Sequence, residues 1–409
     1  MSARPLVLVV SPGDEIFRGY CLEQVAAAYD VVLLTAIEPS WERPFIVDHA
    51  VVDLSDPAAL LAGGLALAER HDLAGVVTWD EFHLVPTARL ARALDLSSPS
   101  AEVMRACRNK SVARTLFARH GVPSAASRKA RTLLEADLAT ETLGYPAVIK
   151  PAAFAGAIGV IRVDGPEELP AAFAFASAGA SRSREDTGVL VEEYLDGPEV
   201  SVECVTHRGV TTAVAVNRKH LGPAPYFDQI GHTVDATDPL LAQVAPAAAA
   251  AVKALGITDG VQHVEMRLVD GRPRLIEVNA RVAGDMIGRL VRLATGIDLP
   301  KAAADLACGR TPDLTPTRSG AASIRMLYPA SSGTLTARHI NQPFAAHTPW
   351  LRQMQWIREI GEKLRLPPEG DLFTARAGFY IVTGRTTAEV TERLDTAADE
   401  ITIATKADR

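Results

Sequence analysis

The sequence has few cysteines and no long apolar run, and each shortage excludes a class of protein. Its four cysteines lie far apart and form no C-x-x-C pair, so neither a zinc site nor a disulfide framework is expected. No run of about 18 apolar residues without charge is present, which excludes a predicted membrane-spanning helix. The apolar run near the N-terminus is too short for a signal peptide. We therefore expect a cytoplasmic protein.

The charge balance also lacks the excess of positive charge that polyanionic partners require. The chain has 409 residues, is 48% hydrophobic and 22% charged, and carries a net charge of −7. These values predict ordinary globular material in two or three domains, with neither nucleic acid nor an anionic membrane as the main partner. Small molecules are the expected partners, and a homo-oligomer is left open.

The first hundred residues lack the G-x-G-x-x-G motif of a dinucleotide site, and the whole chain lacks the G-x-S-x-G of a serine nucleophile. Asp80 and Glu81 follow the last expected strand, where such sheets bind ligands, although they could equally cap the next helix. Apolar runs alternate with helical patterns and predict a small doubly wound parallel sheet. The expected strands are Leu6–Val10, Val31–Thr35, Val51–Leu54 and Gly75–Thr78, and the expected helices are Gly19–Ala28, Pro57–Arg70 and Phe82–Leu94.

A stretch near the middle of the chain, His263–Arg281, carries the residues that we expect at the centre of a site. Apolar and polar residues alternate on both sides of a central Asp-Gly, which predicts two antiparallel strands joined by a turn. Carboxylate and amide oxygens suit Mg²⁺, so Glu265, Glu277 and Asn279 are the candidate ligands. The alternative is a solvent-exposed hairpin face with ordinary charges.

The length of the turn decides whether these three side chains share a face. A two-residue loop at Asp270-Gly271 would pair Glu265 with Ile276 and place the second carboxylate on the opposite face. A three-residue loop that begins at Val269 pairs Glu265 with Leu275 and places the three candidate ligands together. We favour the three-residue loop.

Lysine is scarce, with only eight in the chain, so a lysine at the end of an apolar strand stands out. Lys150 ends the expected strand Ala147–Lys150, and its point charge suits phosphate oxygens, although it could simply reach for water. The small-residue loop that follows, 151–160, can lay backbone N–H groups over phosphates. A second lysine, Lys110, lies on a helix expected from about Ala101 to His120.

Three successive strands are expected next, at Gly188–Leu195, Val200–Thr206 and Val210–Asn217, with Asp196–Pro198 as the first turn between antiparallel neighbours. The end of the first strand can pair an adenine with its backbone N–H and C=O groups. Glu199, just past the turn, can accept hydrogen bonds from both ribose hydroxyls.

Five motifs occur together: N-K at 109–110, V-I-K-P at 148–151, V-E-E-Y-L-x-G-P-E at 191–199, E at 265 and E-V-N-A-R at 277–281. In order and spacing they resemble the motifs of the ATP-grasp carboxylate–amine ligases. The resemblance covers residues 100–310 closely and the flanks more loosely. One departure is the phosphate loop, which is usually richer in Gly and Ser but carries Phe154 and Ile158 here, so its closing geometry is an open question.

The resemblance implies ATP and one or two Mg²⁺ ions as cofactors, with Mn²⁺ as a possible replacement. It implies that the phosphates of ATP contact Lys110, Lys150 and the amides of Gly156 and Gly159. The adenine would contact Glu192, Glu193 and Leu195, and the ribose would contact Glu199. Magnesium would be bound by Glu265, Glu277 and Asn279, and Arg281 would contact the transferring phosphoryl group or the tetrahedral intermediate.

Two further segments, 222–236 and 279–285, resemble the branch of L-amino-acid ligases that join amino acids. Gln229 stands where that branch often has an acid, with Asp228 beside it, so recognition of the substrate amino group is expected to differ. The implied substrate contacts are Gln229, Gly284 and His263. Lys219 would reach the γ-phosphate; the alternative is a lysine at a solvated strand end. His232 would donate a hydrogen bond to the tetrahedral intermediate; the alternative is a histidine that only caps its loop.

The expected fold is α/β: an N-terminal doubly wound parallel-sheet domain (1–100), a lid subdomain of the ATP-grasp type with its preceding helix (101–190), a large subdomain with the metal site (191–310) and a C-terminal lobe (311–409). The implied activity is ATP-dependent joining of an amino-acid carboxylate to an amine through an acyl phosphate. The alternatives are a ligase or carboxylase of purine or other small-molecule biosynthesis, and a non-catalytic ATP-binding module.

Overall fold

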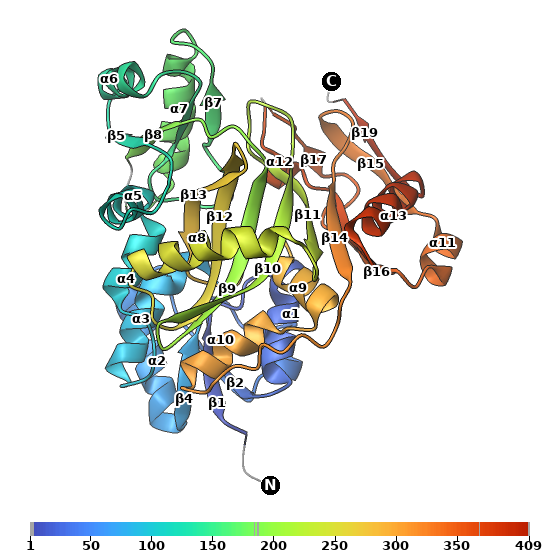
Figure 1. Cartoon of the computed structure of the whole chain (residues 1–409). Coiled ribbons are helices and arrows are strands. Elements are labelled where there is room, and N and C mark those ends of the chain that lie inside the picture. Colours follow the sequence, from blue (N-terminus) through green and yellow to red (C-terminus); the bar gives the residue numbers. More distant parts are fainter. Residues whose placement is uncertain (1–3, 184, 186–187, 368, 408–409) are drawn as a thin grey trace.

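The computed structural model describes residues 4–183, 185, 188–367 and 369–407. Four sheets make up the described part of the chain, and the largest, with eight strands, runs through its centre (Figure 1). None of the helices in the described ranges has both the length and the apolar character that crossing a bilayer requires.

The N-terminal sheet is parallel, with strand order β3-β2-β1-β4, as the alternating pattern predicts. Two of its helices begin at aspartates that cap them. Asp14 accepts a hydrogen bond from the Phe17 amide at the start of α1. Asp56, which directly precedes Pro57, accepts one from the Ala58 amide at the start of α2. The elements are β1 (Leu6–Val10), α1 (Glu15–Ala26), β2 (Asp30–Thr35), a 3₁₀ turn (Arg43–Phe45), β3 (Asp48–Val51), α2 (Pro57–Arg70), β4 (Leu73–Val77), a 3₁₀ turn (Glu81–His83) and α3 (Leu84–Ala93).

The single helix expected from Ala101 to His120 is wrong, because the chain forms two helices there. α4 (Ala101–Arg108) and α5 (Lys110–Arg119) meet at Asn109, whose backbone is extended. The Asn109 side chain accepts hydrogen bonds from the amides of Ser111 and Val112 and so caps α5. The break places Lys110 in the first turn of a helix rather than in the middle of one.

The lid is a four-stranded sheet of order β5-β8-β6-β7, with two helices packed on it. Its small core is rich in alanine, which keeps the helices close to the strands. The elements are β5 (Ser127–Ala130), α6 (Leu133–Leu143), β6 (Ala147–Pro151), β7 (Ile161–Val163), α7 (Leu169–Ala180) and β8 (Val189–Glu193).

The antiparallel turn expected at Asp196–Pro198 is also wrong. β8 pairs with β5 and β6 in the lid, whereas β9 (Glu199–His207) pairs with β10 and β12 in the central sheet. Residues 194–198 therefore pass from one sheet to the other. A two-residue periodicity identifies each strand but not its partner, and the expected sequence neighbours do not pair here.

The central sheet has the order β13-β12-β9-β10-β11-β14-β18-β16. α8 (Leu240–Ala254) covers one face, while α9 (Ile287–Thr295) and α10 (Leu299–Ala307) join α1 of the N-terminal domain on the other (Figure 1). The remaining strands of this half are β10 (Val210–Leu221), β11 (Gln229–Asp235), β12 (Gly260–Val269) and β13 (Arg272–Asn279).

The expected turn between β12 and β13 is wrong in length but the expected face is confirmed. Val269 pairs with Arg272, so the loop has two residues, and both Asp270 (φ 50°) and Gly271 (φ 73°) adopt the left-handed conformation of a type I′ turn. A β-bulge then shifts the register by one residue at Ile276, between the pairs Met266–Leu275 and Glu265–Glu277. Because of the bulge, Glu265 and Glu277 lie on the same face of the hairpin. The three-residue loop was expected to give the same result.

The C-terminal segment extends the central sheet rather than folding apart from it. β14 pairs with β11, β18 pairs with β14, and β16 completes the edge. The four domain boundaries remain a prediction, and the lid sheet itself continues past residue 190 to Glu193. The elements are β14 (Ala321–Leu327), β15 (Gly333–Ile340), α11 (Gln342–His347), β16 (Leu351–Trp356), β17 (Lys363–Leu364), α12 (Leu372–Ala375), β18 (Gly378–Gly384), α13 (Thr387–Asp399) and β19 (Ile401–Lys406), with β17, β15 and β19 forming a separate small sheet.

Candidate active site

A cavity of about 270 Å³ lies between the lid, the crossing segment 194–198, the β12–β13 hairpin and the C-terminal lobe. Most of the residues predicted for the site line it, although they come from distant parts of the chain. Gly159, Lys219 and His232 are not among its lining residues. The predicted residues that line it are Lys110, Lys150, Gly156, Glu192, Glu193, Leu195, Glu199, Gln229, His263, Glu265, Glu277, Asn279, Arg281 and Gly284.

The three candidate metal ligands share the face of the β12–β13 hairpin that borders the cavity. Glu265 lies opposite Glu277, and His263 lies opposite Asn279. The Asn279 Nδ2 donates to Glu265 Oε1 at 3.3 Å, which leaves the amide oxygen for another partner. Two acidic oxygens and one amide oxygen on adjacent strands are donors of the kind that Mg²⁺ accepts.

Two lysines hold these carboxylates. Lys110 Nζ lies 3.1 Å from Glu277 Oε1, and Lys219 Nζ lies 2.6 Å from Glu265 Oε2. Burial favours the neutral form of Glu265, yet Lys219 and His263 outweigh burial and hold the pKa of this carboxyl well below its ordinary value. Lys219 is fully buried behind the cavity surface, where it also contacts Glu199 at 3.3 Å.

The donor set fits a hard divalent ion better than a transition metal. Within the described ranges, no group of three or more His, Cys, Asp or Glu side chains is arranged to hold a metal. The candidate ligands here are only two carboxylates, Glu265 and Glu277, with the amide of Asn279. Such a set needs oxygen atoms from a phosphate or from water to complete an octahedron. The assignment of Glu265, Glu277 and Asn279 to magnesium therefore remains a prediction.

His263 is held as a cation at neutral pH. Its Nδ1 lies 2.6 Å from Glu203 Oε1 and its Nε2 lies 3.1 Å from Glu265 Oε1. Burial alone would lower the pKa of the imidazole, but Glu203 and Glu265 outweigh it and raise that pKa to about 9. The ring thus orients Glu265, in addition to its predicted place beside the substrate.

The second lysine of the motif, Lys150, lies in a buried ion-pair group. Its Nζ is 2.5 Å from Glu192 Oε2, and Arg114 Nε is 2.9 Å from Glu192 Oε1. Burial lowers the pKa of Lys150, and Glu192 acts against that effect. Burial would raise the pKa of Glu192, but Arg114 and Lys150 keep it below its ordinary value. Glu192, predicted at the adenine, therefore fixes Lys150 at the cavity wall.

The crossing segment supplies the other residues predicted to hold the adenosine. The Leu195 carbonyl accepts from Arg267 Nη1 at 3.0 Å, and Glu199 Oε2 accepts from Arg267 Nε at 3.1 Å. The Glu193 side chain accepts from the Ala126 amide at 2.9 Å and from Arg274, so it anchors β8. The Glu193 amide donates to the Ala126 carbonyl at 3.0 Å. The contacts of Glu193 and Leu195 with the adenine remain a prediction.

The predicted phosphate loop contacts α5 and the N-terminal domain. Lys110 Nζ donates to the Phe154 carbonyl at 2.7 Å, and the Phe154 ring lies 5.8 Å from the ring of Phe82 in the N-terminal domain. Gly156 (φ 75°) lines the cavity, and a Cβ added to it would meet no atom within 4 Å. Its role as a backbone donor to phosphate remains a prediction. Gly159 packs instead against Pro151 and Gly179, where a Cβ would lie only 3.1 to 3.2 Å from them.

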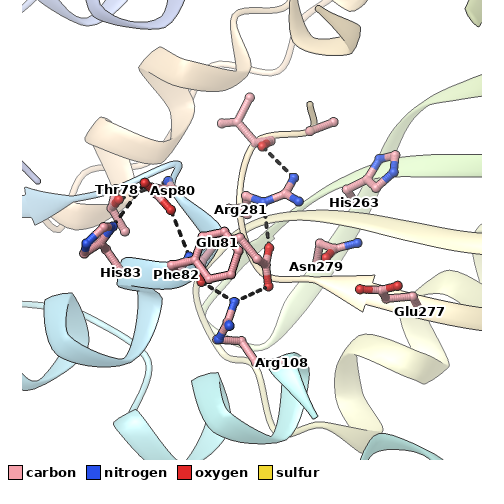
Figure 2. Close-up of polar contacts among 12 residues, drawn as sticks. Thr78, Asp80, Glu81, Phe82, His83, Arg108, His263, Glu277, Asn279 and Arg281 are labelled. Carbon is pink, nitrogen blue, oxygen red and sulfur yellow. Dashed lines mark hydrogen bonds and ion pairs between the residues drawn. The ribbon is translucent and has the colours of Figure 1, made fainter. Parts of the chain in front are cut away.

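Arg281 is oriented by the N-terminal domain. Its Nε donates to Glu81 Oε2 at 2.7 Å, and Arg108 Nη1 lies 3.1 Å from Glu81 Oε1. Figure 2 shows Glu81 between the two guanidinium groups, with Glu277 and Asn279 on the strand that leads to Arg281. The carboxylate at the end of β4, which the sequence left open between ligand binding and capping, therefore contacts a predicted catalytic residue.

The sequence missed an ion pair at the opposite end of the cavity, between Arg376 and Asp285. Arg376 Nη1 donates to Asp285 Oδ1 at 2.7 Å, and its Nη2 donates to the Gln229 carbonyl at 3.1 Å. Burial would raise the pKa of Asp285, but Arg376 and His232 keep it far below its ordinary value. Asp285 and Met286 both have left-handed backbones (φ 46° and 63°), and the ion pair holds this unusual turn in place.

His232 lies behind that turn and not on the cavity wall. Its Nε2 is 3.5 Å from Asp285 Oδ2, its Nδ1 is 3.1 Å from Asn217, and the ring is fully buried. Burial keeps the pKa of His232 below its ordinary value, so the ring is neutral at pH 7. Its predicted catalytic role would have to act through Asp285.

Comparison with known proteins identifies a domain family and a similar fold. Residues 143–289 match the ATP-grasp domain family. These residues form an ATP-grasp domain. Its fold resembles that of L-amino acid ligase from Bacillus licheniformis, with a TM-score of 0.86 over 99% of this chain and 100% of that one at 23% identity.

Two curated relatives share sequence with parts of the chain. An uncharacterized protein of Sinorhizobium fredii is 30% identical over 291 residues, which are 71% of this chain and 60% of that protein. Human carnosine synthase 1 is 31% identical over 258 residues, which are 59% of this chain and 31% of that protein. The chain thus spans less than two thirds of the length of either relative.

Proposed function

We propose that this chain is an ATP- and Mg²⁺-dependent ligase that joins a carboxylate to an amine, with amino acids as both substrates. The observation that carries the proposal is the single cavity in which Lys110 and Lys150 meet the face of Glu265, Glu277 and Asn279. Lysines suit phosphate oxygens, and the oxygen set suits the metal that accompanies them. The likeness to an L-amino acid ligase and to carnosine synthase supports the substrate class.

ATP would enter with its adenine beside the backbone of Glu193 and Leu195 and its ribose beside Glu199. Its phosphates would then extend along Lys150 and Lys110 toward the β12–β13 hairpin. A bound Mg²⁺ at Glu265, Glu277 and Asn279 would neutralise phosphate charge and polarise the bond to the transferred phosphoryl group.

The side chains then favour attack by a carboxylate on the terminal phosphorus. Lys110, Lys150 and Arg281 reduce the repulsion between two anions, and their positions are fixed by ion pairs before any ligand binds. The product is an acyl phosphate, which water would destroy. The contact of the Phe154 ring with the Phe82 ring would help to hold the loop over the cavity and so limit the entry of water.

A ligase or carboxylase of purine or other small-molecule biosynthesis is the second candidate, because phosphoribosylglycinamide synthetase from Anaerococcus prevotii shares the fold at a TM-score of 0.73 and 20% identity. The substrate end of the cavity argues against it. Ile287 and Phe373 line that end, and Arg376 is paired with Asp285. A non-catalytic ATP-binding module would not need the paired carboxylates.

A panel of amino acids, singly and in pairs, incubated with ATP and Mg²⁺ tests the proposal. We expect ADP and phosphate release that depends on an added amino acid, together with a product whose mass is the sum of two amino acids less one water. ADP release without any acceptor would indicate simple hydrolysis. No release with any amino acid would favour the alternatives.

A further inference from the structure

The substrate end of the cavity carries a carboxylate, Asp228, that the ATP-binding part does not use. Asp228 lines the cavity on the segment between β10 and β11. Within the described ranges, no other residue forms a hydrogen bond or an ion pair with its side chain. It differs in this respect from Glu192, Glu265 and Asp285, which each contact a cation.

The loop that carries Asp228 is fixed from several sides. The Gly222 amide donates to the Asp228 carbonyl at 2.8 Å and closes the loop, and the Arg162 amide of the lid donates to the Pro225 carbonyl at 3.0 Å. The ring of Tyr226 lies 6.0 Å from the ring of Phe175 on α7. The lid and the central sheet thus hold Asp228 at the wall together.

The surroundings of Asp228 describe the ligand that it would meet. Ile287 and Phe373 give this end an apolar lining, and Arg376 shares its charge with Asp285. An anionic carboxylate beside an apolar lining suits a primary ammonium group attached to an apolar side chain.

Asp228 also has the acidity that a base near neutral pH needs. Burial and, to a smaller extent, the charge of Asp371 raise the pKa of the Asp228 carboxyl to about 6, although Arg376 acts against them. Tyr328 also faces it. A group with this pKa is ionised at pH 7 and can still accept a proton with useful driving force.

We propose that Asp228 is the general base that removes a proton from the ammonium group of the amine substrate before that amine attacks the acyl phosphate. This inference rests on the proposed ligase function. The ammonium gives one proton to the Asp228 carboxylate, and the nitrogen lone pair forms the C–N bond at the carbonyl carbon. The C–O bond to phosphate then breaks with its electron pair on the phosphate oxygen, which takes the second proton of the nitrogen and leaves as hydrogen phosphate.

Asp228→Asn tests the step with two nucleophiles. An amino-acid acceptor is protonated at neutral pH and needs the base, whereas hydroxylamine is largely unprotonated and does not. We expect the variant to form the amide about 10² to 10⁴ times more slowly, while hydroxamate formation from the same carboxylate and ATP changes less than about threefold. Asp371→Asn is the matched control, since asparagine can still cap α12, and it should retain amide synthesis.

The pH profile of the wild-type enzyme gives a test that does not depend on the variant's folding. Amide formation should rise with pH through about 6 and then level off, because only the ionised Asp228 accepts the proton. Hydroxamate formation, at a constant concentration of unprotonated hydroxylamine, should lack this rise, and Asp371→Asn should move the rise to lower pH.

Three results would overturn the inference. They are an equal loss of amide and hydroxamate in Asp228→Asn, an amide rate that the substitution leaves unchanged, and an identical rise in both wild-type profiles. Failure of the proposed ligase function would be a different result, since the wild type would then form neither product with any carboxylate.

Discussion

The two ends of the cavity differ in their side chains and in the elements that carry them. At the nucleotide end, charged side chains stand on strands and are joined in buried ion pairs, such as Lys150 with Glu192 and Lys219 with Glu265. At the substrate end, the side chains come mainly from loops and from the C-terminal lobe. In the part of the chain that the structure describes, no other residue forms a hydrogen bond or an ion pair with the Asp228 side chain. The first end is organised before any ligand arrives, whereas the second leaves a charge for the ligand to neutralise.

This difference predicts which reaction steps each substitution affects. Changes at the nucleotide end should impair every reaction that consumes ATP, because they act before the acyl phosphate forms. Changes at the substrate end should leave ATP use largely intact and impair the use of the amine. The largest effects are expected where a side chain faces the transferred phosphoryl group.

Glu277→Gln should have the largest effect. The amide keeps the shape but removes a negative oxygen from the predicted metal site and from the contact with Lys110. We expect amino-acid-dependent ADP formation to fall by about 10² to 10³-fold. Glu69→Gln, an exposed substitution on α2, is the control and should change nothing. Full activity of Glu277→Gln would remove the basis for the metal assignment.

Lys150→Met should act on ATP binding and on stability together. It removes the phosphate contact and leaves Glu192 with Arg114 alone. We expect the KM for ATP to rise at least about tenfold and the free energy of unfolding to fall by roughly 3–5 kcal/mol, as when a buried ion pair loses one member. Lys253→Met on the exposed side of α8 is the control, and urea titration with initial rates measures both quantities. An unchanged KM for ATP would place the phosphates elsewhere.

Arg376→Lys should affect the substrate end alone. Lysine keeps the charge but cannot reproduce the two contacts of the guanidinium with Asp285, so the turn at Asp285 would loosen. We expect the KM for the amine to rise about tenfold, with the KM for ATP changed by less than about twofold. Equal increases in both values would contradict the division of the cavity into two ends.

Glu81→Gln should have the smallest effect, since Glu81 acts through Arg281. Glutamine can still accept a hydrogen bond but lacks the charge that holds Arg281 and Arg108. We expect kcat to fall by about three- to tenfold at an unchanged KM for ATP. Glu38→Gln, which removes an exposed pairing with Arg43 in the same domain, should not alter kcat. A rise in KM for ATP in Glu81→Gln would instead indicate a shifted lid.

The same contrast explains how much of the site the sequence could predict. Strand periodicity placed Glu265, Glu277 and Asn279 on one face, and that face is confirmed although the turn is shorter than expected. The bulge at Ile276 restores the alignment, but nothing in the local residue pattern distinguishes a bulge from a longer loop. The sequence therefore predicted the correct face for these three side chains but the wrong strand register.

Pairing across long sequence distances could not be predicted in the same way. The expected hairpin at Asp196–Pro198 failed because β8 pairs inside the lid, and the pairing of Arg376 with Asp285 joins residues that are 91 positions apart. The sequence around Arg376 or Asp285 contains no motif that predicts the pairing of the two residues. The break at Asn109 did carry a signal, since asparagine is a common helix N-cap, but the apolar pattern continued across it.

A crystal structure with Mg²⁺ and a non-hydrolysable ATP analogue would test the central claim most directly. We predict the adenine beside the backbone of Glu193 and Leu195, the phosphates between Lys110 and Lys150, and the metal held by Glu265, Glu277 and Asn279. A nucleotide bound outside this cavity, or a metal that contacts neither Glu265 nor Glu277, would contradict the account.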